Sequence, residues 1–166
     1  MNVRFGMSVA AAALTLSFVA CGGGEKAPAA KTDTTAAAPA AAATPAAAAT
    51  YMAPTGKTWE VKMMGDAKGY RFDPKDLTIK VGDAVKFIMV SGGPHDVTFW
   101  ADSIPAGAET QLTANMPGHT APLTAPMTIN PNASFIASFT GVPAGVYHFY
   151  CTPHLAMGMV GKITVQ

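Results

Sequence analysis

The stretch Cys151–Met159, CTPHLAMGM, decides how this chain of 166 residues is interpreted. It places a thiol, an imidazole and two thioethers within nine positions, and the apolar alternation of GKITV follows it directly. Such a cluster is either an ordinary apolar turn that contains sulfur or most of a metal site. The sequence around it distinguishes these two interpretations.

The residues that lead into Cys151, GVYHFYC, alternate in the way that a half-buried strand does. If Cys151 points inward at the end of this strand, Tyr147 and Phe149 point inward with it, whereas His148 and Tyr150 face solvent. A second strand follows in GKITV, with its own apolar side chains inward. We therefore predict a loop between two strands that folds its side chains around one point.

From Gly56 to the C-terminus, short runs of alternating apolar and polar residues are separated by Gly, Pro, Asn and Asp. A period of two is typical of strands, and it places Leu77, Ile79 and Val81 on one face. Seven or so such runs predict an antiparallel β-sandwich of one domain. Residues 101–131, rich in Pro, Thr and Ala, are expected to be loop with a short helix or an irregular edge strand.

The first third of the chain has a different character. Residues 1–20 have one early positive charge at Arg4, then an apolar run and small residues, the pattern of a signal peptide. FVAC resembles the bacterial lipobox, with Phe18 where Leu is usual, and implies that Cys21 carries lipid. Residues 21–55 are nearly all Ala, Pro, Thr and Gly, which predicts a disordered tether. We expect an exported protein of the cell envelope, lipid-anchored to a membrane and facing the periplasm or exterior.

The charges exclude some partners. From Lys57 onward, eight Lys and Arg balance eight Asp and Glu, so the domain is formally neutral. Neither nucleic acid nor an anionic membrane surface is indicated as a partner. Between Glu109 and Lys162 there is no Asp, Glu, Lys or Arg, so this stretch is either buried or presented as uncharged surface.

The isolated Cys151 is best explained by metal ligation. The chain has two Cys, and a lipid-bearing Cys21 leaves Cys151 without a disulfide partner. Together with His154 and Met159, it supplies a thiolate, an imidazole nitrogen and a thioether. One further nitrogen completes a copper site with two His, one Cys and a weak axial Met. The candidate for that nitrogen is His95, in the uncharged turn VSGGPHDVTF.

A family resemblance supports the copper interpretation. GGPHDVTF, SIPAG and YCTPHLAMGMVGKITV, in that order, resemble the plastocyanin-like proteins of the cupredoxin family, and the C-x2-H-x4-M motif is highly specific. The resemblance covers residues 57–166 and implies an eight-stranded Greek-key β-sandwich. It also implies one type 1 copper ion near one end of the sandwich, bound by His95, Cys151, His154 and Met159.

The resemblance implies further roles around the copper. Asp96, where Asn is common in the family, and Thr152 form the pair that holds the cysteine loop by a hydrogen bond, although an ionised Asp cannot donate one. Tyr150 matches an outward aromatic residue that relatives use in partner contact, and the ring edge of His154 is the expected electron exit. The expected apolar docking patch consists of Gly92, Gly93, Pro94, Leu155, Ala156 and Met157.

These features predict a blue copper electron carrier and not an enzyme. It would shuttle single electrons through Cu(I) and Cu(II), as a monomer, between redox proteins such as a cytochrome, a reaction centre or an oxidase. Zinc fits poorly because methionine is a poor fourth ligand, and covalent haem needs two Cys before its His. A multicopper enzyme needs many His, but the chain has four, with His119 and His148 to spare. The remaining alternative is a copper-binding storage or delivery protein of the cell envelope.

Overall fold

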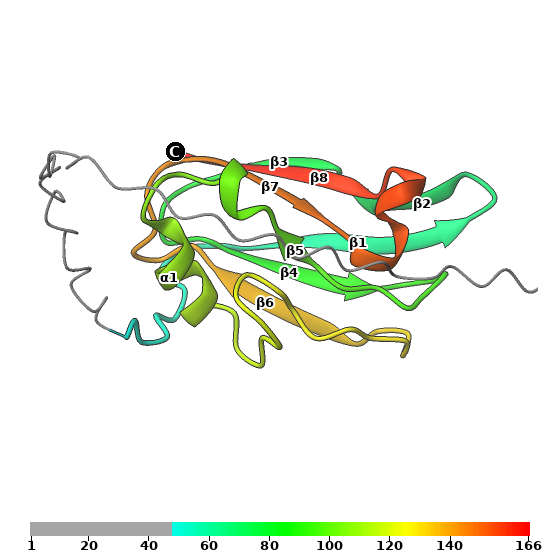
Figure 1. The fold of residues 1–166 in the computed structure, drawn as a ribbon, viewed down its shortest axis with the longest axis horizontal. Helices are drawn as coiled ribbons and strands as arrows, with labels where there is room; N and C mark the ends of the chain where they lie inside the picture. Colours follow the sequence, from blue (N-terminus) through cyan, green and yellow to red (C-terminus); the bar gives the residue numbers. More distant parts are fainter. Residues whose placement is uncertain (1–47) are drawn as a thin grey trace, which may run out of the picture. The chain divides into compact units, whose positions relative to one another are not determined.

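The computed structural model describes residues 48–166, which form two four-stranded sheets packed into a sandwich (Figure 1). This confirms the predicted eight-stranded β-sandwich, whereas the signal peptide, Cys21 and most of the tether lie outside the described residues. The sheets have the strand orders β2-β1-β4-β6 and β3-β8-β7-β5. The strands are β1 (Thr58–Asp66), β2 (Gly69–Asp73), β3 (Asp76–Ile79), β4 (Ala84–Met89), β5 (Thr98–Phe99), β6 (Ser134–Ser138), β7 (Gly145–Tyr150) and β8 (Val160–Val165). The helical elements are η1 (Ala101–Ser103), α1 (Ala108–Ala114) and η2 (Thr152–Met157).

Both sheets are mixed, so the prediction of an antiparallel sandwich is wrong at two strand pairs. β1 pairs with β4 in parallel, and β3 pairs with β8 in parallel. The chain passes from the first sheet to the second between β2 and β3 and returns between β3 and β4, so neighbours within a sheet are often not consecutive. A period of two reports which face of a strand is buried, but it does not report the direction of the neighbouring strand.

Strand parity is confirmed in β7, the strand that leads to the metal cluster. Tyr147, Phe149 and Cys151 are buried, whereas His148 is exposed and Tyr150 is half-buried. Phe149 packs edge-on against Phe72 and Phe87, with ring centroids 4.7 and 5.3 Å apart. These rings come from both sheets, so they fix the distance between the sheets next to the strand end where Cys151 lies.

β3 is shorter than its sequence pattern predicts. The strand ends at the buried Ile79, and Val81, predicted on the same face, is 49% exposed. Gly82 follows with a φ of 93°, in the left-handed region that favours glycine. The turn that Gly82 allows removes Val81 from the inward face, so this part of the prediction is wrong.

Helix α1 lies within residues 101–131, which confirms the expected short helix in that region. Within residues 48–166, no helix is long and apolar enough to cross a membrane. α1 ends at Ala114, and the side chain of Asn115, its C-cap residue, is fully buried. The amide of Asn115 makes four hydrogen bonds, with Met52 N (2.9 Å), Gln111 Nε2 (2.9 Å), Ser138 O (3.0 Å) and Thr140 O (2.7 Å).

The segment that precedes β1 is held against the same end of the sandwich as α1. The carbonyls of Thr50 and Ala53 accept hydrogen bonds from the side chains of Gln111 and Thr140, both at 3.0 Å. Residues 50–55 have the composition of the tether, but they are hydrogen-bonded to the folded domain. Figure 1 shows this segment beside α1, at the end of the sandwich opposite η2.

Tyr147 closes the turn before β7. Its ring is fully buried, and its hydroxyl donates a hydrogen bond of 2.6 Å to Pro143 O, four residues upstream. Burial raises the pKa of the Tyr147 phenol to about 12. Because this value lies above the ordinary pKa of about 10, the folded state favours the neutral phenol. The stability that the neutral Tyr147 phenol contributes to the folded state is complete below pH ~10 and is lost as the pH rises toward 12.

We expect Tyr147→Phe to lower the free energy of unfolding by about 1 to 2 kcal/mol at neutral pH, because the Pro143 carbonyl loses its donor. The variant should also lack the part of the alkaline decline in stability that the phenol causes. Urea unfolding of both chains at pH ~7 and ~11 measures both effects. An equal fall in stability of the two chains at the higher pH would contradict the assignment.

Candidate metal centre

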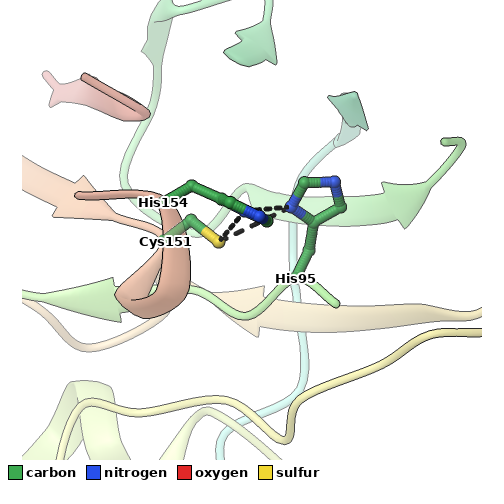
Figure 2. A group of neighbouring side chains, drawn as sticks. All are labelled: His95, Cys151 and His154. Atoms are coloured by element: carbon green, nitrogen blue, oxygen red, sulfur yellow. Dashed lines mark hydrogen bonds between the residues drawn. The ribbon is translucent and has the colours of Figure 1, made fainter. Parts of the chain in front are cut away.

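Three candidate metal ligands meet inside the sandwich, at the end where β7 stops (Figure 2). Cys151 Sγ lies 3.5 Å from His95 Nδ1 and 3.3 Å from His154 Nδ1, and the two nitrogens are 3.2 Å apart. Cys151 and His95 are fully buried, and His154 is 5% exposed. The structure therefore brings together two of the three residues of the C-terminal motif, Cys151 and His154, and the distant His95.

The loop from Cys151 to Met159 is folded back on itself by η2. Cys151 N donates to Met159 O (3.1 Å), and Met159 N donates to His154 O (3.2 Å). Gly158 ends η2 with a φ of 80°, which favours glycine. Met159, fully buried, thus lies directly before β8, with its backbone hydrogen-bonded to that of Cys151.

His95 is fixed by its backbone and by its second ring nitrogen. It exchanges two backbone hydrogen bonds with Thr128, at 2.9 and 2.8 Å. Its Nε2 lies 2.9 Å from Ser91 O, and since a carbonyl can only accept, Nε2 is the donor. This tautomer leaves Nδ1 with a free lone pair that points to the cluster.

The three donor atoms fit a metal ion. With sides of 3.2 to 3.5 Å, the triangle has its equidistant point ~1.9 Å from each atom, close to the ~2.0 to 2.3 Å of nitrogen and thiolate ligands at a first-row metal. A soft thiolate with two imidazoles and a neighbouring thioether suits copper better than hard cations, which prefer oxygen ligands.

Burial controls the protonation of the ligands in the metal-free protein. It raises the pKa of the Cys151 thiol to about 11, an effect that the backbone N–H of Asp96 partly offsets. Burial, followed by the nearby His95, lowers the pKa of His154. The thiol is therefore protonated and the His154 ring is neutral at pH 7, so a metal that binds Cys151 releases a proton.

Asp96 connects the turn of His95 to the cysteine loop. It is 4% exposed, and its Oδ1 accepts a hydrogen bond of 2.6 Å from the backbone N–H of Thr152. The Thr152 hydroxyl lies 3.3 Å from the hydroxyl of Thr98 instead. Asp96 and Thr152 thus meet as the sequence suggests, but through a backbone donor for which an ionised carboxylate is a good acceptor.

The residues of the expected docking patch surround the ligand end. Leu155 and Met157 are 40% and 54% exposed. Gly92, Gly93 and Ala156 are exposed, and Pro94 is half-buried. Sequence reasoning missed Ile129, which is 67% exposed and whose Cα lies 3.5 Å from the position of a Cβ on Gly93.

His119, one of the two histidines outside the predicted copper site, is exposed in a loop, as its sequence context suggests.

Two aromatic contacts near the cluster were also missed. Tyr70 of β2 stacks on the His154 ring, with ring centroids 3.7 Å apart and planes inclined by 13°. Trp100 packs against the half-buried Tyr150, with centroids 4.5 Å apart. Tyr70 shares its strand face with the buried Phe72, so strand parity could have placed it inward, but only the fold brings it to His154.

Comparisons with known proteins identify the family of this chain. Residues 59–166 match the model of a family described as copper binding proteins, plastocyanin/azurin family. The chain is similar to plastocyanin of Prochlorothrix hollandica, with 40% identity over 109 residues, or 66% of this chain and 73% of that protein. Plastocyanin of Synechococcus sp. (strain JA-2-3B'a(2-13)) is 42% identical over 110 residues, 66% of this chain and 74% of that protein. A solved structure of a mutant fern plastocyanin is 32% identical, covers 65% of this chain and 100% of that chain, and gives a TM-score of 0.49.

The chain therefore belongs to the plastocyanin/azurin family of copper-binding proteins. Copper is the cofactor of that family, and the grouping of His95, Cys151 and His154 is consistent with a type 1 copper site.

We expect Asp96→Asn to raise the reduction potential of the copper-loaded protein by on the order of 100 mV. A carboxylate close to the thiolate stabilises the more positive, oxidised site, and the amide removes that charge while keeping an acceptor for Thr152 N. Voltammetry of both proteins measures the shift. Thr98→Val, which loses a hydroxyl contact but no charge, is the control. A lower potential in Asp96→Asn would contradict this role of the carboxylate.

Proposed function

We propose that this protein is a blue copper electron carrier, which holds one copper ion through His95, Cys151, His154 and Met159. The observation that carries the proposal is the buried triangle of one sulfur and two nitrogen donors in a chain of the plastocyanin/azurin family. Met159 is buried directly before β8, and its backbone carbonyl accepts a hydrogen bond from Cys151 N, which supports its assignment as the weak fourth ligand. Copper bound there exchanges one electron between Cu(II) and Cu(I).

The protein's part is to keep the ligands in one arrangement. His95 is held by Thr128 and Ser91, and Cys151 is held by its backbone bond to Met159. The ligand cluster is almost fully buried, so water does not compete for it. Ligands that cannot rearrange between oxidation states reduce the reorganisation that each electron transfer requires.

Partners are expected to dock on the exposed apolar surface around His154. Leu155, Met157 and Ile129 are exposed there, and the stretch from 110 to 161 carries no Asp, Glu, Lys or Arg. Redox encounters use small interfaces, below about 1,200 Å², because the partners must separate quickly. The proposed partners are redox proteins such as a cytochrome, a reaction centre or an oxidase, which a monomer meets transiently.

Stopped-flow electron transfer to a purified c-type cytochrome tests this function. We expect transfer whose rate changes less than about threefold between 0.05 and 0.5 M salt, because an uncharged patch gives little steering. Leu155→Lys should slow transfer about tenfold or more, because it buries a charge at the interface. Val146→Lys is the matched control, since Val146 is also 40% exposed but lies at the start of β7, far from the cluster. Blue protein that reduces neither this cytochrome nor a small-molecule oxidant would favour copper storage or delivery.

We also propose that residues 1–20 are a signal peptide, that Cys21 carries lipid and that residues 21–55 tether the domain to a membrane, facing the periplasm or exterior. The support is the FVAC sequence and the Ala/Pro composition. Mass spectrometry of the membrane-extracted protein should find a lipid-modified Cys21 at the N-terminus; an unmodified Cys21 would exclude the anchor.

A further inference from the structure

The two ligand histidines are oriented by different means. Both ring nitrogens of His95 have a polar contact. Nε2 donates a hydrogen bond to Ser91 O, and Nδ1 faces the ligand cluster. For His154, the ring hydrogen bonds found within residues 48–166 involve only Nδ1, which faces the same cluster. Nothing polar in that part of the chain therefore stops the His154 imidazole from rotating about its Cβ–Cγ bond.

Tyr70 takes the place of the missing polar contact. Its ring lies on the face of the His154 ring, with centroids 3.7 Å apart and nearly parallel planes. It also meets the His95 ring edge-on, at 6.2 Å and 70°. A flat ring on the imidazole face opposes rotation of that imidazole, because rotation drives the ring edge into the tyrosine.

The backbone next to Tyr70 is built to admit its ring. Gly65 of β1 is paired directly with Tyr70, and a Cβ on Gly65 would lie 2.6 Å from Tyr70 Cε1. The same glycine packs on the backbone of Gly92 in the His95 turn, where a Cβ on Gly92 would lie 2.4 Å from Gly65 Cα. Two glycines thus let the tyrosine ring and the His95 turn approach the site from the same side.

We propose that Tyr70 is a positioning residue, which holds the imidazole of His154 in its metal-binding orientation by stacking, as Ser91 holds that of His95 by a hydrogen bond. The proposal rests on the copper site proposed above, but the stack is present without metal. The contact needs the ring of Tyr70 and not its hydroxyl, so Tyr70→Phe should preserve it and Tyr70→Leu should lose it.

The test begins with the metal-free protein, where NMR should show the His154 ring protons shifted upfield by Tyr70 and close to its ring protons. Tyr70→Phe should keep the upfield shift, and Tyr70→Leu should lose it. Copper affinity, measured by competition with a Cu(I) chelator, should fall about two- to tenfold in Tyr70→Leu and stay within about twofold in Tyr70→Phe. Phe135→Leu is the control, since Phe135 stacks on Phe87 with centroids 5.1 Å apart, away from the ligands.

Each outcome decides the proposal. A wild-type protein without proximity between the two rings would overturn it, whether or not the leucine variant folds. Unchanged ring shifts and affinity in Tyr70→Leu would also overturn it, as would an equal loss of affinity in Phe135→Leu. A wild-type protein that shows the stack but forms no blue complex would contradict the proposed function and leave the role of Tyr70 in the metal-free protein intact.

Discussion

Cys151→Ser is expected to abolish the intense visible absorption of the copper-loaded protein. The colour of a site with one Cys and two His arises from its copper–thiolate bond, and serine offers a hard oxygen that remains protonated at neutral pH. Copper affinity should fall by about 100-fold or more, because a first ligand matters at least as much as its hydrogen-bond partners. The measurement is a copper titration followed by visible absorption.

The fold of Cys151→Ser should persist, because the substitution keeps the size of a side chain buried beside Phe149 and Met159. Circular dichroism provides that check. Thr152→Ser, one residue away, is the matched control and should remain blue, since it keeps both the thiolate and the backbone N–H that Asp96 accepts. An unchanged colour in Cys151→Ser would remove Cys151 from the metal site.

Asn115→Ala is expected to lower the free energy of unfolding by about 3 kcal/mol, the largest effect on stability that we predict outside the core. The fully buried amide satisfies two carbonyls at the end of β6, a backbone N–H at Met52 and the side chain of Gln111. Alanine leaves the buried groups without partners and releases the segment before β1. Urea unfolding measures the loss.

Gln111→Ala is the control for Asn115, since it removes one of the four hydrogen bonds of Asn115 together with the bond to Thr50 O, and it should cost about 1 to 2 kcal/mol. The copper spectrum of Asn115→Ala should equal that of the wild type, because α1 and η2 lie at opposite ends of the sandwich (Figure 1). A stability within about 1 kcal/mol of the wild type would show that the segment before β1 contributes little.

Local pattern predicted the parts of the fold that depend on neighbouring residues. Alternation gave the buried face of β7, and the spacing of Cys151, His154 and Met159 fits a loop between two strands. Pattern could not give the parallel pairing of β1 with β4, because both directions bury the same face. Composition likewise could not show that residues 50–53 are held, because their partners lie about 60 to 90 positions away.

The candidate site was predictable to the same extent. Cys151 and His154 are three positions apart, so their proximity follows from local sequence, whereas His95 is 56 positions from Cys151 and was only a candidate until the family resemblance supported it. The sequence predicted that Asp96 faces Thr152, but it did not predict that the carboxylate accepts its hydrogen bond from the backbone N–H of Thr152. Tyr70 has no local signal beyond strand parity, because its place on His154 depends on how β2 pairs with β1 across Gly65.

Addition of Cu(II) to the purified metal-free protein tests the central claim most directly. We predict an intense blue complex that saturates at one copper per chain, bleaches with a reductant and returns with an oxidant, since residues 48–166 hold one buried set of donors for one ion. A colourless or pale complex at saturation, or a blue colour that reductant does not bleach reversibly, would contradict the electron-carrier account.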